Sequence, residues 1–485
     1  MTSTLRYNQR FFLISCVFFI LLTSACGHVD RNDFLFERVK TSLMIDNVNI
    51  VDVELERVIL NQQVIIKGGI IVEIRPAQTP FDDSAINFKD AKGGFLMPGL
   101  IDMHVHAYEK SAFELSLSHG VTHVRVMNGV EQHLEWRSEQ SAGNWLASGM
   151  TVSSPIIRSG ESHPLIWTAD SSAEARKLVQ KAKKEGYDLI KAYGSLSKES
   201  MLAIIDEANE LSIPIAKHGP HPVKGMLWKD LKGFQSFEHV EDIYQGPLNY
   251  TFNNEKLQPV LETLAQTKTP ITPTLNIFWQ LTQISKDKHD FIDGLPKDYI
   301  APITRWQDEN NQVERWLHSS ENMFAHNQKT FAFLSTITKA LSKNNIPILV
   351  GSDAGILLSP HGLATHNELR LLREAGLSTF SVLRSATILP AKALGKTTEI
   401  GQVKVGFKAD LILTTSDPTK ELSILENPSV VIKSGHWLAK EELVQLQEHA
   451  IEQQSLWSEL AVLIKITSLK SSQYSISSLF FYGVV

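Results

Sequence analysis

The stretch that decides the fold is Phe95-Leu96-Met97-Pro98-Gly99-Leu100-Ile101-Asp102-Met103-His104-Val105-His106. Its apolar residues predict a buried strand, and residues i and i+2 of a strand point to the same side. The imidazoles of His104 and His106 would therefore face together at the end of that strand. Two imidazoles in this arrangement can chelate one borderline metal ion. A His-x-His pair by itself is weak evidence, because hydrogen-bonded core histidines are common.

Downstream of this stretch, helical and strand patterns alternate. Ser171 and Glu174 form a capping box for a helix that Gly186 ends, and a strand follows over residues 187–193. Ser197 caps a second helix, which leads into a strand over residues 213–217. Helix–strand pairs at this rhythm indicate an α/β protein with a buried parallel sheet. Eight pairs would close a (β/α)8 TIM-like barrel, with catalytic groups at the C-terminal ends of its strands.

Short β-branched segments flank this alternating region at both ends, over residues 48–53, 58–60, 64–74, 409–413 and 429–432. We therefore expect a small β-sandwich domain built from residues 40–92 and 398–440, around a hydrolase barrel over residues 93–397. Residues 441–485 are expected to form a C-terminal helix, its pattern running over 440–464, and a tail. Residues 276–341 are expected to be largely helical, either as an insertion over the barrel mouth or as ordinary packing outside it.

The start of the chain has the pattern of an export signal. Arg6 and Arg10 precede an apolar run over residues 11–25, and no acidic residue occurs before Asp30. Leu22-Thr23-Ser24-Ala25-Cys26 resembles the lipobox of bacterial lipoproteins, which implies removal of residues 1–25 and lipidation of Cys26. The alternative is ordinary cleavage after Ala25. We therefore expect an exported protein, lipid-anchored in the bacterial cell envelope and facing the periplasm.

Composition sets broad limits on the class of protein. With 485 residues, 43% hydrophobic and 21% charged, the chain is neither collagen-like nor wholly disordered. Its two cysteines cannot build a disulfide framework. The net charge of −6 comes without a basic stretch that would follow a phosphate backbone, so nucleic acid is not an expected partner.

The run from Pro98 to His106 resembles the signature of the amidohydrolase superfamily, and the resemblance extends over about residues 48–440. It implies further metal ligands where later strands end. These are Lys191 in Asp188-Leu189-Ile190-Lys191, His218 after Ile213–Lys217, His239 in Phe237-Glu238-His239, and Asp353 in Val350-Gly351-Ser352-Asp353. Taken singly, each has an ordinary explanation: a surface lysine, core histidines, a helix cap. Their agreement in order and spacing with the family favours a metal site.

The resemblance also implies a mechanism with two divalent ions, zinc being expected. One ion would be held by His104, His106 and Asp353, and the other by His218 and His239. Lys191 would bridge them as a carbamate formed with carbon dioxide. The two ions would hold a shared hydroxide and polarise a carbonyl, while Asp353, the expected catalytic residue, moves a proton to the leaving nitrogen.

The flanking sequences most resemble imidazolonepropionase-related amidohydrolases, a group that includes prolidase-like dipeptidases. Lys191 favours the two-metal, peptidase-like branch, and Gly219-Pro220-His221 after His218 lacks the glutamate that deaminases of this superfamily carry. We therefore expect a dipeptide or similar small amide as substrate. Hydrolysis of a cyclic amide or lactone, or an envelope binding protein that has lost catalysis, are the alternatives. Candidate substrate contacts are Tyr193, Arg158, His163 and His221; Arg125 is expected to be structural.

Overall fold

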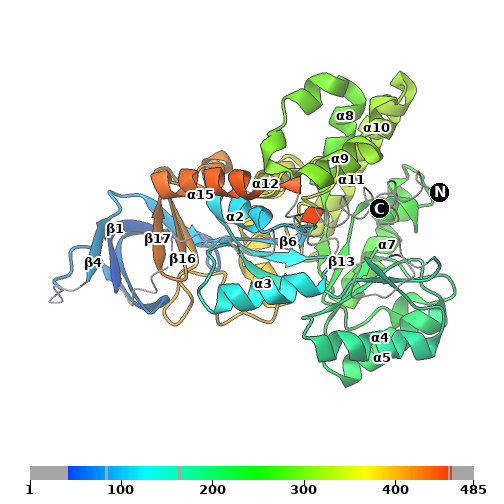
Figure 1. Ribbon diagram of the computed structural model, residues 1–485, viewed down its shortest axis with the longest axis horizontal. Coiled ribbons are helices and arrows are strands. Elements are labelled where there is room, and N and C mark those ends of the chain that lie inside the picture. Colours follow the sequence, from blue (N-terminus) through cyan, green and yellow to red (C-terminus); the bar gives the residue numbers. More distant parts are fainter. Residues whose placement is uncertain (1–41, 82–85, 162, 164, 457–458, 461–485) are drawn as a thin grey trace, which may run out of the picture.

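The computed structural model describes residues 42–460, except 82–85, 162, 164 and 457–458. The predicted signal peptide, Cys26 and the end of the C-terminal tail lie outside these residues. The described chain forms a (β/α)8 barrel and a β-rich domain, as the sequence predicts. Figure 1 shows the β-rich domain at one end, with strands from the start of the chain in blue beside strands from its end in orange.

Parallel strands build the barrel in two groups. The first is β6 (Leu100–Val105), β7 (Val121–Val126) and β8 (Gly149–Val152); the second is β11 (Ile190–Ala192), β12 (Ile215–His218), β13 (Ser236–Glu238) and β14 (Ile271–Thr272). β9 (Ile156–Arg158) and β10 (Ile166–Thr168) pair beside β11. Single parallel bridges, Ser153 to Leu189, Ile271 to Ile348 and Val105 to Ala354, complete the ring. The segment from Ile348 to Ala354 therefore takes the eighth strand position, next to β6.

Helices follow the strands and cover the barrel. They are α2 (Ser111–Ser118), α3 (Glu131–Ser141), α4 (Ser172–Glu185), α5 (Lys198–Glu210), α6 (Glu241–Gln245), α7 (Asn254–Thr267), α12 (Leu363–Glu374), α13 (Thr379–Ser385) and α14 (Ile388–Ala393). The predicted helix ends are confirmed: Ser171 and Ser197 accept backbone N–H groups of α4 and α5, and Gly186 ends α4 at φ 91°. The strand after α4 is shorter than the predicted residues 187–193, because β11 pairs over three residues, and the strand after α5 runs over Ile215–His218 instead of residues 213–217.

The β-rich domain contains one sheet in the order β17-β16-β15-β5-β1-β2-β3, with β4 beside β1. Its strands are β1 (Leu43–Asp52), β2 (Arg57–Lys67), β3 (Ile70–Pro76), β4 (Asn87–Asp90), β5 (Phe95–Pro98), β15 (Leu411–Thr414), β16 (Val430–Lys433) and β17 (His436–Ala439). Pairing of β5 with β15 joins the strands that precede the barrel to the strands that follow it. Residues 95–98 thus belong to this sheet, beyond the predicted boundary at residue 92, because their backbone pairs with β1 and β15. The division into domains otherwise stays a prediction.

Four helices between β14 and the eighth strand position form what we call the lid: α8 (Leu275–Asp293), α9 (Pro302–Glu309), α10 (Gln312–Leu317) and α11 (Glu321–Lys343). Figure 1 shows them projecting together from the barrel. Side chains of α8, α10 and α11 line the cavity at the C-terminal ends of the barrel strands. Of the two arrangements left open by the sequence, the structure therefore favours an insertion over the barrel mouth.

The predicted terminal helix is present as α15 (Lys440–Gln453), which packs through Leu443 and Leu446 against Leu117 of α2. It ends earlier than the pattern over 440–464 indicates, because the backbone of Gln454 is extended. Among the described residues, none of the helices combines the length and the apolarity needed to cross a membrane.

Candidate metal centre

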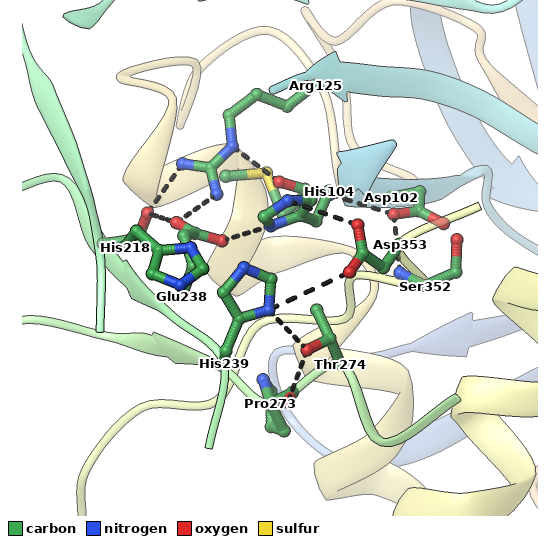
Figure 2. Close-up of polar contacts among 12 residues, drawn as sticks. Asp102, His104, Arg125, His218, Glu238, His239, Pro273, Thr274, Ser352 and Asp353 are labelled. Atoms are coloured by element: carbon green, nitrogen blue, oxygen red, sulfur yellow. Dashed lines mark hydrogen bonds and ion pairs between the residues drawn. The ribbon is translucent and has the colours of Figure 1, made fainter. Parts of the chain in front are cut away.

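Side chains from three distant barrel positions meet around Asp353. His104 from the end of β6, His239 just after β13 and Asp353 each offer a ligand atom within 4.8 Å of one another. His104 Nε2 lies 3.5 Å from Asp353 Oδ1, and His239 Nδ1 lies 4.0 Å from Oδ2. His106 Nε2 approaches Asp353 Oδ1 to 3.2 Å. Figure 2 shows Asp353 directed between His104 and His239.

His218 and Lys191 lie beside this cluster. The ring of His218 is 4.5 Å from that of His239 and stacks on Tyr193 at 4.0 Å, while its Nε2 lies 3.3 Å from Asp242 Oδ2. Lys191, from β11, is 1% exposed, and its Nζ has no hydrogen-bond partner among the described residues. All six predicted ligands line one cavity of about 610 Å³.

A buried ion pair behind the cluster orients His104. The Nδ1 atom of His104 lies 2.8 Å from Glu238 Oε2, which leaves Nε2 directed at Asp353. Glu238 and Arg125 are both fully buried, and Arg125 Nη2 donates to Glu238 Oε1 at 2.8 Å. The dashed lines in Figure 2 follow this chain from Arg125 through Glu238 to His104. Metal-binding histidines usually have their second ring nitrogen fixed in this way.

Other polar contacts fix the strand ends. Asp102 Oδ1 accepts the backbone N–H groups of His104 and Ser352, each at 3.0 Å, and so ties β6 to the eighth strand position. His239 Nδ1, the ring nitrogen 4.0 Å from Asp353 Oδ2, also lies 2.9 Å from Thr274 Oγ1. His239 and Asp353 both have positive φ, at 67° and 55°. Positive φ is uncommon outside glycine, although Asp and His adopt it more readily than most residues, and it recurs at functional sites.

Burial controls the protonation of the cluster. Burial, with a contribution from Lys191, lowers the pKa of His104 to about 4, and burial lowers that of His239 to about 3. Burial also lowers the pKa of Lys191 to about 8. Burial alone would raise the pKa of Asp353, but the neighbouring histidines hold it well below its usual range. At neutral pH His104 and His239 are therefore neutral imidazoles and Asp353 is a carboxylate, the protonation states that a metal ion requires.

The donor set fits divalent metal ions. Imidazole nitrogens and carboxylate oxygens are the ligands that zinc and related ions take. Among the six candidate ligands, Lys191 Nζ and Asp353 Oδ1 are buried and make no hydrogen bond within the described residues, although Oδ1 lies 3.2 Å from His106 Nε2. Leaving such groups unpaired is costly, so a cation near Asp353 and a modification of Lys191 would each satisfy one of them.

The predicted substrate contacts divide into two groups. Tyr193 lines the cavity, whereas Arg158, His163 and His221 are absent from its described lining residues, and all four roles stay predictions. Arg125 is buried and structural, as expected. Sequence reasoning missed Glu238 and the lid residues. The sequence offered one indication of Glu238, namely its position directly before His239. No sequence motif marks the lid residues that line the cavity.

The comparisons with curated proteins match mostly deaminases. An adenine deaminase of Chelativorans sp. (strain BNC1) is 25% identical over 206 residues, which are 39% of this chain and about a third (33%) of that protein. A 5'-deoxyadenosine deaminase of Methanosarcina mazei is 24% identical over 404 residues, covering 77% of this chain and 84% of the relative.

Solved structures share the fold. Bottromycin amidohydrolase superposes with a TM-score of 0.72 at 20% identity, covering 87% of this chain and 92% of that one. A Xaa-Pro dipeptidase with methionine bound in its active site superposes with a TM-score of 0.63 at 20% identity. The match covers 82% of this chain and 100% of that one. Identities at this level show the fold alone. The amidohydrolase family profile, in contrast, matches residues 95–438, well over half of the chain. This protein therefore belongs to the amidohydrolase family, whose members are hydrolases acting on C–N bonds.

Proposed function

We propose that this protein is a two-metal hydrolase that cleaves the C–N bond of a dipeptide or similar small amide. His104, His106 and Asp353 would hold one divalent ion, and His218 and His239 the other. Lys191 would bridge the two as a carbamate, with zinc as the expected metal. The histidines, Asp353 and Lys191 line one cavity, which supports this assignment.

The observation that carries the proposal is the state of Lys191. A lysine ammonium that is 1% exposed and lacks a hydrogen-bond partner among the described residues pays a large desolvation penalty. Carboxylation of its Nζ would replace that cation by an anion with two oxygens, which would attract metal ions rather than repel them. An ordinary core lysine would instead place its Nζ near a carbonyl, as Lys217 does with the carbonyls of His218 and Gly219.

The chemistry follows from what the residues around the cavity can do. Divalent ions at such a site polarise a carbonyl oxygen and lower the pKa of bound water to about 7. Asp353 would accept the proton released by the attacking water and deliver it to the leaving nitrogen. The Arg125–Glu238 pair would keep His104 in one orientation during this step. The lid would exclude bulk water from the cavity.

One sequence feature favours an amide over a nucleobase, and the size of the cavity is compatible with it. Gly219-Pro220-His221 follows His218, so the glutamate that deaminases of the superfamily carry at this point is missing. A cavity of about 610 Å³ is in the range of small-molecule sites and matches a dipeptide. The likeness to a Xaa-Pro dipeptidase is consistent with this substrate but bears on the fold alone.

The test compares wild type with Lys191→Ala on a dipeptide library that includes X-Pro, X-Arg and N-acyl amino acids. Adenine and 5'-deoxyadenosine serve as deaminase substrates. We expect amide hydrolysis by wild type with close to two metal equivalents, and nearly complete loss in the variant with partial rescue by short carboxylic acids. Lys198→Ala, on the surface at the start of α5, is the matched control and should keep full activity. Full activity of Lys191→Ala, or deamination without amide hydrolysis, would contradict the proposal.

We further propose that the protein is exported and held at the cell envelope by a lipid on Cys26. The basic and apolar residues before Ala25 and the lipobox-like sequence support this location.

A further inference from the structure

Building on the proposed function, we infer that Arg315 of the lid binds a free carboxylate of the substrate, next to an apolar side chain. The enzyme would then prefer small amides that end in a carboxylate over the same amides with a neutral end. This inference concerns the wall of the cavity that the lid forms. The lid residues lie in a different part of the sequence from the candidate metal ligands.

The charges around the cavity are unevenly placed. Among its described lining residues, Lys191 and Arg315 are the two lysines or arginines, and Lys191 lies with the metal ligands. The lining carboxylates also belong to that side, since Asp353 contacts His104 and His106 and Asp242 contacts His218. Glu241, next in the chain to Asp242, accepts a hydrogen bond from Gln245. The lid thus contributes a cation to the cavity and no carboxylate among the described lining residues.

The guanidinium of Arg315 is available to a ligand. Neither an ion pair nor a side-chain hydrogen bond engages it within the described part of the chain, and its side chain is exposed at the cavity. Glu314, the adjacent acid, instead lies 4.0 Å from His318 Nε2. The guanidinium carbon of Arg315 lies 4.8 Å from the centre of the Trp316 ring. Stacking of this kind limits the orientations of the guanidinium and leaves its edge N–H groups for an acceptor.

The surroundings of Arg315 favour a carboxylate attached to an apolar group. Phe278 and Leu281 of α8, Trp316 of α10 and Met323 of α11 line the same cavity, beside the polar but uncharged or basic lid side chains Gln312, His326, Asn327 and Thr330. Together these side chains offer apolar surface but no anion. Arginine binds carboxylates through two parallel N–H···O bonds, which fix direction as well as charge. A dipeptide ending in an apolar residue supplies both the carboxylate and the apolar group.

The experiment uses two forms of one substrate, a dipeptide ending in leucine and its C-terminal carboxamide, with wild type, Arg315→Gln and Lys329→Gln. Lys329 is the matched control, a lid lysine that contacts the Phe252 ring and is absent from the described cavity lining. Metal content and thermal midpoint of each variant establish that it is folded and loaded.

In wild type we expect kcat/KM to be about tenfold higher for the free carboxylate than for the carboxamide, the size of a charge-assisted hydrogen bond at an exposed site. Arg315→Gln should lower kcat/KM for the carboxylate by about the same factor, mainly through KM, and leave the carboxamide within about twofold. Lys329→Gln should change neither. Equal effects of Arg315→Gln on both substrates, or no effect on either, would overturn the role of Arg315 while leaving amide hydrolysis intact. If wild type hydrolyses neither form nor any other amide, it is the proposed function that fails.

Discussion

Replacing Glu238 by glutamine should separate the stability of the barrel from its affinity for metal. Glu238 Oε1 accepts from Arg125 Nη2 at 2.8 Å and from Ser236 Oγ, and Oε2 lies 2.8 Å from His104 Nδ1. Glu238→Gln keeps the shape of the side chain and removes its charge. Arg125, fully buried, then remains as a cation without a counter-ion. Removing one partner of a buried ion pair costs about 3–5 kcal/mol.

The lower end of that range applies here. Arg125 keeps its hydrogen bonds to Met103 O at 2.7 Å and to Gln235 Oε1 at 2.9 Å. These two oxygens still stabilise part of the buried positive charge. We therefore expect the free energy of unfolding of the metal-free protein to fall by about 3 kcal/mol. His104 meanwhile loses its anionic partner. Losses of this type weaken metal binding about 10- to 100-fold, or about 1.4–2.7 kcal/mol.

Urea unfolding of the chelated protein measures the first effect, and zinc titration against a competing chelator measures the second. The double variant Arg125→Met/Glu238→Gln is the control, because it removes both charges and should recover most of the stability. It should not recover the metal affinity, since His104 still lacks its carboxylate. A folded Glu238→Gln protein that binds zinc within twofold of wild type would refute the reasoning. Recovery of affinity in the double variant would do so as well.

The barrel could be predicted because its strands and caps are encoded locally. Ser171, Gly186 and Ser197 fix helix ends within a few residues of sequence, and the alternation of helices and strands implies the parallel sheet. The spacing of His104 and His106 on one strand is also local, whereas the other candidate ligands were named from the resemblance to the amidohydrolase superfamily. That resemblance places ligands near strand ends, which barrel closure brings together.

Contacts between distant residues could not be predicted in this way. Arg125 and Glu238 are 113 positions apart, and their pairing depends on how β7 and β13 face each other after the barrel closes. The pattern of apolar residues in the lid helices suits packing outside the barrel as well as an insertion over its mouth. Their position over the mouth could therefore be seen only in the structure. Arg315 has no neighbouring motif at all. The family resemblance thus points to the candidate ligands, and tertiary structure shows which residues position them and which side chains face them across the cavity.

Two further predictions concern the start of the chain and a buried carboxyl group of α12. Cys26→Ser should move the protein from the membrane fraction to the soluble fraction and abolish labelling by palmitate, whereas absence of label in wild type would contradict a lipid anchor. Glu368→Gln should raise stability at high pH. Glu368 is fully buried. One of its carboxylate oxygens accepts from Asn276 N at 2.7 Å, and the other has no hydrogen-bond partner among the described residues. Burial raises the pKa of Glu368 from 4.5 to about 8. The folded state therefore holds a proton that the unfolded state has lost between about pH 4 and pH 8, and wild-type stability falls as pH rises through this window. Glutamine does not titrate, so the variant's advantage should grow across the window to the order of 4 kcal/mol at pH 9 and vanish near pH 4. Parallel urea curves for both proteins at pH 4, 6 and 9 measure this difference, and a constant offset would show that Glu368 is not protonated in the folded barrel.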